Sequence, residues 1–271
     1  MLKIDRIYLG NCLDLFRNID DGSVELVIID PPYNLNKDFG NRSDKWETVD
    51  AWFEWSKIWL DEVKRILKTG GNVFVYGIHH HLCWLQGYMY RIGLTYRRQI
   101  IWYYENGFAG YSKRTLAAHY EPILWFSKGS NYTYYPIREP YKSEERLKYK
   151  ITKNGKVWRP NPEGRLAGDV WRFPTLAGRR FRDEKVNHPT QKPLSISLRI
   201  IKHFSNKGDL VVIPFAGSGS ECLAALMEGR RFIGFELNPA YVKLAEKRIA
   251  EWKKQPELTL RYLKNQDSLQ A

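Results

Sequence analysis

The sequence predicts an α/β domain in which helices cover both faces of a parallel β-sheet. Short, β-branched runs such as "VELVII" (24–29) alternate with longer segments whose apolar residues recur at helical spacing. A glycine-rich turn, "PFAGSGS" (214–220), joins another such run to a helix, as in the βα units of doubly wound sheets. The length of 271 residues suits one sizeable domain, or one domain with an insertion.

The first part of the chain supplies the earlier strands and helices. The run 24–29 is almost entirely apolar, which indicates a strand buried on both faces. Residues 47–68 place large apolar side chains such as Trp52 and Val63 at helical spacing, and "TGG" (69–71) is expected to end that helix. The same patterns predict a strand at 72–77, a helix at 79–94, a strand at 97–104 and a strand within 121–129.

Regular patterns return after residue 186. They predict a helix at 192–205, a strand at 209–215, a helix at 220–229, a strand at 231–236 and a helix at 238–254. We therefore divide the chain into a first half of the domain (1–129), an inserted region (130–186) and a second half (187–271).

The inserted region differs from the rest in texture and in charge. It is rich in Pro, Gly, Tyr and Arg and has no sustained period, and residues 127–186 carry 15 Lys and Arg against 7 Asp and Glu. A solvated loop of no special role would have this composition too. A structureless loop of this length is unusual in a compact domain, so we favour a functional insertion.

Composition narrows the class of protein further. A formal net charge of +13 favours a polyanionic partner, of which nucleic acid is the usual one, although a generically basic surface is the alternative. No run approaches the length of a membrane span, and the charged start "MLKIDRIYLGN" is unlike a signal peptide. Cys12, Cys83 and Cys222 are far apart, so we expect a reduced, cytoplasmic protein.

Two motifs follow buried strands. The turn at 214–220 lets the backbone approach a ligand, and Glu236, 19 residues after Gly217, can accept hydrogen bonds from ribose hydroxyls. A purely structural βα turn would show the same glycines. The second motif, "DPPY" (30–33), also ends a strand, and taken alone it could be ordinary turn chemistry.

Together the motifs resemble a known family. "DPPY", then "NHPTQKP" (187–193), then "PFAGSG" (214–219) is the order of the circularly permuted β-class amino-directed DNA methyltransferases of the DPPY type, which use S-adenosylmethionine. "GNCLDLF" (10–16), "HYEPILWFSKG" (119–129) and "GDVWRF" (168–173) add to the resemblance. It implies a Rossmann-like methyltransferase fold with an inserted target-recognition region.

The resemblance also implies a cofactor site. Phe215, Gly217 and Gly219 would form its floor, and Glu236 would hold the ribose. Further cofactor neighbours would be Asn11 and Cys12 near the adenine, Asp30, and His188, Thr190 and Lys192 around the methionine carboxylate.

Two positions depart from the family's pattern. Asn11 and Ile213 stand where the family usually has Asp. An Asn amide can still bond an adenine edge, whereas Ile213 cannot replace a carboxylate near a cationic sulfonium or ammonium.

The catalytic residues implied are Asp30, Pro31, Pro32 and Tyr33. The Asp30 carboxylate and the Pro31 carbonyl would accept the N–H bonds of an exocyclic amino group, and Tyr33 would stack on a base flipped out of the duplex. Asp in the first motif position points to N6 of adenine. Cytosine N4 as the target, a catalytically weak DNA-binding subunit and a nucleotide-dependent oxidoreductase are the alternatives.

The expected partner is double-stranded DNA. Candidate contacts from the inserted region are Lys148, Lys150, Arg159, Arg172, Arg179, Arg180 and Arg182, each of which could equally be a solvated surface charge. We expect a prokaryotic, nucleoid-associated enzyme. We also expect no metal site, because the cluster of His79, His80, His81 and Cys83 lacks further ligands. The resemblance leaves open a cognate restriction endonuclease and a homodimer.

Overall fold

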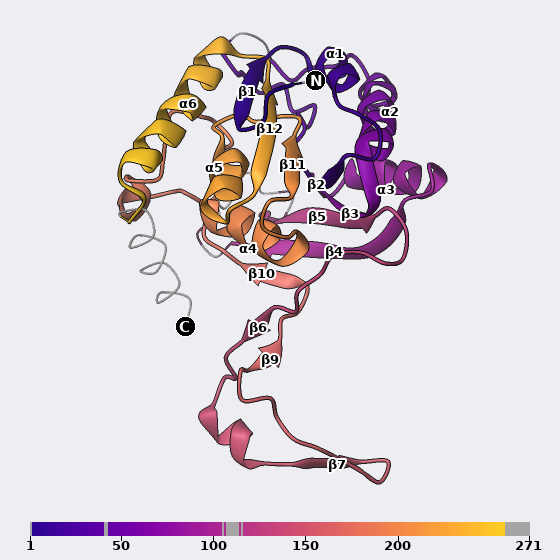
Figure 1. Ribbon diagram of the computed structural model, residues 1–271, viewed down its shortest axis with the longest axis vertical. Helices are drawn as coiled ribbons and strands as arrows, with labels where there is room; N and C mark the ends of the chain where they lie inside the picture. The colour runs from indigo at the N-terminus through magenta and orange to yellow at the C-terminus, as the bar shows by residue number, and fades with distance from the viewer. Residues whose placement is uncertain (1, 41–42, 105, 107–113, 115, 258–271) are drawn as a thin grey trace.

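The computed structural model describes residues 2–40, 43–104, 106, 114 and 116–257. Helices pack around one large sheet, and a slender arm projects from it (Figure 1). The strands are β1 (Arg6–Leu9), β2 (Val24–Ile29), β3 (Leu67–Tyr76), β4 (Thr95–Tyr103), β5 (Tyr120–Ser127), β6 (Arg138–Glu139), β7 (Ile151–Lys153), β8 (Lys156–Trp158), β9 (Arg165–Leu166), β10 (Val170–Arg172), β11 (Leu210–Ile213) and β12 (Arg231–Glu236).

Six α-helices and three short 3-10 helices connect these strands in the described part of the chain. The α-helices are α1 (Cys12–Leu15), α2 (Val49–Ile66), α3 (Leu82–Arg91), α4 (Leu194–Phe204), α5 (Ser220–Met227) and α6 (Pro239–Lys254). The 3-10 helices are η1 (Phe16–Asn18), η2 (Glu144–Lys148) and η3 (Arg179–Phe181). None of the helices among the described residues is both long and apolar enough to cross a membrane.

The main sheet has eight strands in the order β1-β12-β11-β2-β3-β5-β4-β10. Strands from the two ends of the sequence meet at its centre, where β11 lies parallel to both β12 and β2. The first five strands are mutually parallel, whereas β5 returns from β4, inserts between β3 and β4, and runs antiparallel to both. The carboxyl ends of β2, β11 and β12 therefore share one edge of the sheet.

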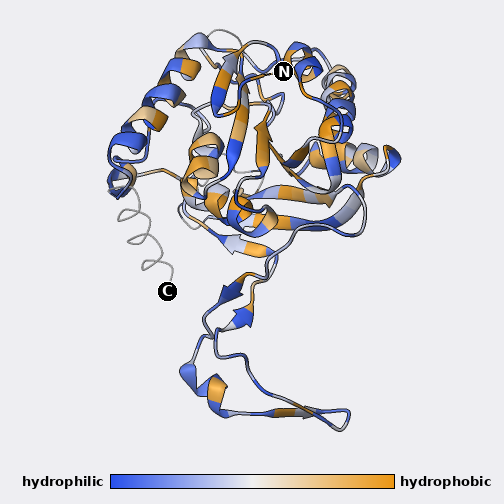
Figure 2. Cartoon of the chain, in the orientation of Figure 1, coloured by the Kyte–Doolittle hydropathy of each residue, from blue (hydrophilic) through white to orange (hydrophobic). Residues whose placement is uncertain are grey.

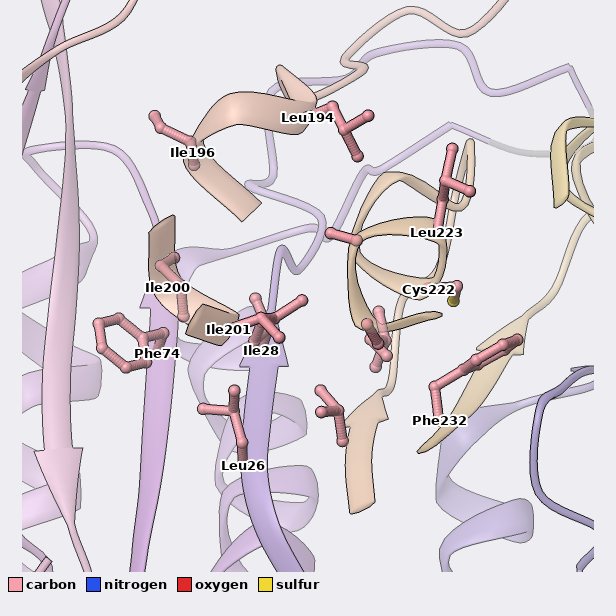
Figure 3. Close-up of a cluster of buried hydrophobic side chains, with 14 of the residues drawn as sticks. Leu26, Ile28, Phe74, Leu194, Ile196, Ile200, Ile201, Cys222, Leu223 and Phe232 are labelled. Atoms are coloured by element: carbon pink, nitrogen blue, oxygen red, sulfur yellow. The ribbon is translucent and has the colours of Figure 1, made fainter. Parts of the chain in front are cut away.

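Each face of the sheet carries its own hydrophobic layer. Along β2, Leu26 and Ile28 pack with α4, α5 and α6, while Val27 and Ile29 point to the layer formed with α1, α2 and α3. Figure 3 shows the first layer, with side chains of α4 and α5 pointing at those of the strands. Alternate burial on two faces explains why the sequence of β2 is apolar almost throughout.

The predicted fold class is confirmed, with two differences. Helix α2 ends at Ile66, and "TGG" lies inside β3 instead of in a turn after the helix. Gly70 there has φ +87°, and an added Cβ would lie 2.6 Å from the carbonyl oxygen of Asn131. The close approach of these two backbone segments therefore requires glycine. The reversed strand β5 also makes the sheet mixed instead of wholly parallel.

The region 130–186 divides into two structural parts. Residues 138–166, which we call the arm, leave the domain as a ribbon in which β6 pairs with β9 and β7 with β8 (Figure 1). Strand β10, by contrast, joins the main sheet beside β4 and buries Trp171. The part that projects is thus shorter than the inserted region expected from composition, because β10 and the residues around it pack on the domain.

The buried side chain of Asn72 in β3 gives a test of this packing. Its Nδ2 donates to the carbonyl oxygens of Thr133 (2.7 Å) and Phe204 (3.0 Å), and its Oδ1 accepts from Trp125 Nε1 at 2.9 Å. The substitution Asn72→Leu leaves these partners unpaired in buried or half-buried surroundings, so we expect a loss of about 3 kcal/mol in the free energy of unfolding. Urea denaturation measures this loss. The exposed control Asn18→Leu should stay close to wild type, and an equally stable Asn72→Leu protein would contradict the packing described.

Candidate cofactor and amino-acceptor site

A cavity of about 540 Å³ opens at the shared carboxyl edge of the sheet. Segments from distant parts of the sequence line it, including the ends of β2, β11 and β12. The predicted site residues along its wall are Asn11, Cys12, Asp30, Pro31, Pro32, Tyr33, His188, Thr190, Lys192, Phe215, Gly217 and Glu236. The topology therefore brings both motifs to a single site.

Three contacts from neighbouring elements hold the turn at 30–33. Trp52 Nε1, on α2, donates to the carbonyl oxygen of Pro32 at 2.8 Å. His81 Nδ1 lies 3.0 Å from the carbonyl oxygen of Tyr33, and the backbone N–H of Tyr33 donates to Asp44 Oδ2 at 3.1 Å. The two prolines restrict the backbone between these contacts, so the direction in which Asp30 leaves β2 is fixed.

A buried ammonium lies beside the Asp30 carboxylate. Lys192 Nζ is 3.0 Å from Asp30 Oδ1 and 3.2 Å from Glu121 Oε2, and the Lys192 side chain is 5% exposed. Burial opposes the charged ammonium, but the two facing carboxylates outweigh it and raise the pKa of Lys192 above its usual value. The side chain therefore stays protonated at neutral pH, and its partners are carboxylates of the protein.

Tyr33 contributes a contact that the sequence did not indicate. Its hydroxyl donates to Asp30 Oδ1, the same oxygen that Lys192 contacts. Burial and the charge of Asp30 raise the pKa of Tyr33, so the hydroxyl keeps its proton. Because the contacts to Asp30 from the described residues end at Oδ1, Oδ2 is the oxygen that can accept a hydrogen bond from a ligand.

The glycine turn positions Glu236 and His188. The backbone N–H of Gly217 donates to Glu236 Oε2 at 2.8 Å, and that of Asn238 donates to Glu236 Oε1 at 2.8 Å. Gly217 has φ +49°, and an added Cβ would lie 2.9 Å from His188 Nε2, so glycine is required there. Burial raises the pKa of Glu236, while the two N–H contacts lower it. The acid at the end of β12 is therefore already aligned along the cavity wall.

Gly219 is placed differently from the other predicted floor residues. It lies behind the cavity wall, where an added Cβ would be 2.6 Å from the Cβ of Ala245 on α6. Its φ of +76° forms the turn into α5. This glycine allows helix α6 to pack closely against the turn, and its place in the floor of the cofactor site stays a prediction.

The remaining predicted residues lie along the wall. Asn11 caps α1 by accepting from the N–H of Leu13, and burial raises the pKa of Cys12 to about 12, which keeps its thiol protonated. Phe215 packs against Trp55 and Trp59, with ring centroids 5.8 and 5.9 Å away.

The segment before α4 completes this side of the cavity. Burial lowers the pKa of His188 to about 4, so its ring is neutral, and its Nδ1 accepts from the backbone N–H of Thr190 at 3.3 Å. Tyr241 on α6 packs edge-on against the His188 ring at 4.4 Å. The histidine thus orders the segment that carries Lys192.

Two acids in the cavity were missed by the sequence analysis. Glu121 is the second residue of β5, inside "HYEPILWFSKG", and Glu221 follows directly after the glycine turn. Because Glu221 lies in the first turn of the helix that follows the glycine turn, its position in the sequence could have indicated that it lines the cavity. Ile213, in contrast, points into the core with α4 and α5 and is 1% exposed.

The predicted DNA contacts lie outside the cavity. Lys148, Lys150 and Arg159 are exposed on the arm, Arg172 is exposed on the edge strand β10, and Arg179, Arg180 and Arg182 are exposed in or next to η3. The arm carries nine Lys and Arg against four Asp and Glu. Exposed large hydrophobic side chains accompany them on the arm, among them Trp158 at 62%. Figure 2 shows that hydrophilic and hydrophobic residues both occur along the arm. No group of three metal-binding side chains occurs in the described part of the chain, and His81 contacts Tyr33.

Known proteins resemble this chain in sequence and in architecture. A family model described as DNA methylase matches residues 24–247. The type II methyltransferase M1.MboII of Moraxella bovis is 36% identical over 260 residues, covering 90% of this chain and 96% of the relative. The DNA adenine methyltransferase YhdJ of Escherichia coli (strain K12) is 32% identical over 244 residues, covering 89% and 81%. The solved M1.HpyAVI-SAM complex shares the fold, with a TM-score of 0.63 at 22% identity over 90% of this chain and 98% of that one.

Removal of the buried ammonium tests the site's electrostatics. In Lys192→Met, the carboxylates of Asp30 and Glu121 remain inside without a cation, so we expect a loss of about 3–5 kcal/mol in unfolding free energy at neutral pH. Because the raised pKa of Lys192 keeps it charged up to strongly alkaline pH, this contribution is fully present at neutral pH. The contribution should decline only at strongly alkaline pH, as the pH rises through the raised pKa of Lys192.

Urea unfolding of wild type and variant at neutral pH measures the loss. The control Lys247→Met removes an exposed ion pair with Glu251 on α6 and should change little. A Lys192→Met protein as stable as this control would show that the ammonium is not buried between the two acids.

Proposed function

Since this chain belongs to the DNA methylase family, we propose that it transfers the methyl group of S-adenosylmethionine to the N6 amino group of adenine in duplex DNA. One observation carries the proposal. The Asp30 and Pro31 acceptors border the same cavity as Gly217 and Glu236, so an amino group and a nucleoside cofactor can meet there. Asp in the first motif position favours adenine, and the related YhdJ is named a DNA adenine methyltransferase.

The cavity suits the cofactor in size and in its polar groups. About 540 Å³ lies within the range of small-molecule sites. Glu236 would accept from the ribose hydroxyls, Asn11 and Cys12 would border the adenine, and Phe215 and Gly217 would lie beneath it. When bound, S-adenosylmethionine supplies an electrophilic methyl group on a positively charged sulfur.

Asp30 and Pro31 act on the amino group that is to be methylated. An exocyclic amine is a poor nucleophile because its lone pair is delocalised into the ring. With Asp30 Oδ2 and the Pro31 carbonyl each accepting one N–H, the nitrogen is steered toward tetrahedral geometry, and the positive charge that develops on it is offset. Lys192 and Tyr33 hold the other carboxylate oxygen, so these acceptors are in place before the base arrives.

The base must leave the helix to reach this cavity. Base flipping is the general solution where an enzyme acts on an atom buried in the duplex. Tyr33 would stack on the flipped base, as an aromatic side chain in the cavity wall. His188, Thr190 and Lys192 would border the methionine end of the cofactor, with Lys192 acting chiefly on Asp30.

The arm and its neighbours would contact the DNA as the target-recognition region. Its exposed basic residues can neutralise phosphates, and exposed aromatic and amide groups are suited to base contacts. Because M1.MboII is named a type II methyltransferase, we further propose that the chain protects DNA of the nucleoid against a cognate restriction endonuclease.

The substitution Asp30→Ala tests the chemistry. We expect a fall in methyl transfer of about 10²-fold or more, because the group that stabilises the developing charge is lost. Transfer of labelled methyl groups to unmethylated genomic DNA measures the rate, and gel-shift assays should show DNA binding close to wild type. Near-normal transfer by the variant would contradict the mechanism. Labelled methyl groups in cytosine would show that cytosine, not adenine, is the target. If the wild type bound DNA without labelling it, the chain would be a non-catalytic subunit.

Charge removal from the arm tests the DNA-binding surface. The triple substitution of Lys148, Lys150 and Arg159 by Ser should weaken DNA binding and make its dependence on salt shallower by up to about 3 in log–log slope. A matched triple substitution of Lys243, Lys247 and Lys253 on α6 removes the same charge from another face. Equal effects of the two triples, measured by fluorescence anisotropy across salt concentrations, would show that only net charge matters.

A further inference from the structure

Glu221 is a buried acid for which the proposed mechanism has no role. It occupies the first turn of α5 and lines the cavity, although its side chain is 5% exposed. Its Oε1 accepts from the hydroxyl of Ser197 on α4 at 3.2 Å. No Lys, Arg or His nitrogen in the described part of the chain lies within the 4.0 Å of an ion pair with Glu221. A carboxylate buried with only a neutral donor is costly, and either a proton or a cationic ligand can offset its charge.

The cations near Glu221, Lys192 and Arg248, do not fully offset the cost of burying its charge. Burial, followed by the charge of Asp30, raises the pKa of Glu221 to about 7, and the charge of Lys192 only partly opposes this. The other titratable groups that face it are Tyr76 of β3 and Cys222 of α5. A cationic ligand in the cavity would supply what these groups do not.

The position of Glu221 relates it to one end of the cavity. Ser197, its donor, lies on α4, which directly follows the segment 188–192 that we expect beside the methionine end of the cofactor. Ser220 Oγ donates to the carbonyl oxygen of Lys192 at 2.9 Å, which fastens the start of α5 to this segment. Glu236, which we expect to hold the ribose, lies elsewhere on the cavity wall, at the end of β12. Glu221 therefore lies on the side of the cavity where we expect the amino-acid part of the cofactor.

The same geometry bears on Ile213, which stands where the family usually has Asp. A carboxylate is expected before the Pro-Phe pair, and Ile213 points into the apolar layer under α4 and α5 instead. The cavity of this chain therefore lacks an acid from that position, while Glu221, eight residues later, brings one from the adjacent helix.

We propose that Glu221 binds the α-ammonium group of the methionine moiety of S-adenosylmethionine, supplying the carboxylate that position 213 lacks. The proposal rests on the proposed function. The ammonium offers three N–H donors and a compact charge, which suit the Glu221 carboxylate. The sulfonium has no N–H to donate, and its methyl group must face the amino acceptor at Asp30.

Three ligands distinguish which charged group of the cofactor Glu221 binds. S-adenosylmethionine carries the sulfonium and the ammonium, S-adenosylhomocysteine carries only the ammonium, and 5′-methylthioadenosine carries neither. For Glu221→Gln, isothermal titration calorimetry should show about 10- to 100-fold weaker binding of the first two ligands and unchanged binding of the third. The control Glu228→Gln makes the same change just beyond the other end of α5 and should bind all three like the wild type.

The other outcomes each overturn a stated part of the account. Weaker binding of S-adenosylmethionine alone would assign Glu221 to the sulfonium. Weaker binding of all three would make its role structural, and unchanged binding of all three would leave the ammonium without this partner. If the wild type bound none of the three, the proposed function itself would fail.

A pH series gives a second readout. Bound ammonium favours ionised Glu221, so wild-type affinity for S-adenosylhomocysteine should fall as the pH drops below about 7, where the carboxylate becomes protonated. In Glu221→Gln this fall should be absent between about pH 8 and about pH 6, since His188 titrates only near pH 4. The same fall in the variant would assign the dependence to another group and contradict the proposal.

Discussion

The ammonium of Lys192 lies between the carboxylates of Asp30 and Glu121, and the site depends on this buried contact. It joins three parts of the chain that are far apart in sequence: the end of β2, the start of β5 and the segment before α4. A carboxylate that is to accept hydrogen bonds from an amino group must be correctly aimed. A buried cation on one of its oxygens fixes its direction and keeps the other oxygen for the ligand.

The fold brings these parts together through the centre of the sheet. Strand β11, from the second half of the chain, inserts beside β2 from the first, so the glycine turn and the "DPPY" turn open on one cavity. Helices on both faces then fix the turns: Trp52 of α2 holds Pro32 from one side, and α4 carries the neighbouring Lys192 segment on the other. The arm lies outside this arrangement (Figure 1), so the DNA contacts that we propose for it can vary without disturbing the cavity.

The sequence predicts much of this architecture because local rules govern it. The apolar run 24–29, the helical spacing in 47–68 and the glycine turn are signals within short windows, and each corresponds to an element of the structure. Long-range contacts are not encoded in this way. Nothing near Lys192 in sequence reveals that Asp30 and Glu121 will flank it, and Gly219 resembles a ligand-contacting glycine until α6 is placed against it. The same holds for Ile213 and Glu221, whose surroundings depend on how α4 and α5 pack.

A structure of the protein bound to S-adenosylhomocysteine and a duplex carrying its target sequence would test the central claim most directly. The account predicts that the target adenine is out of the helix, with its N6 about 3 Å from Asp30 Oδ2 and from the carbonyl oxygen of Pro31. Lys192 should still lie against Asp30 Oδ1. A base held elsewhere in the cavity, or an Asp30 carboxylate turned wholly toward Lys192 and away from the base, would contradict it.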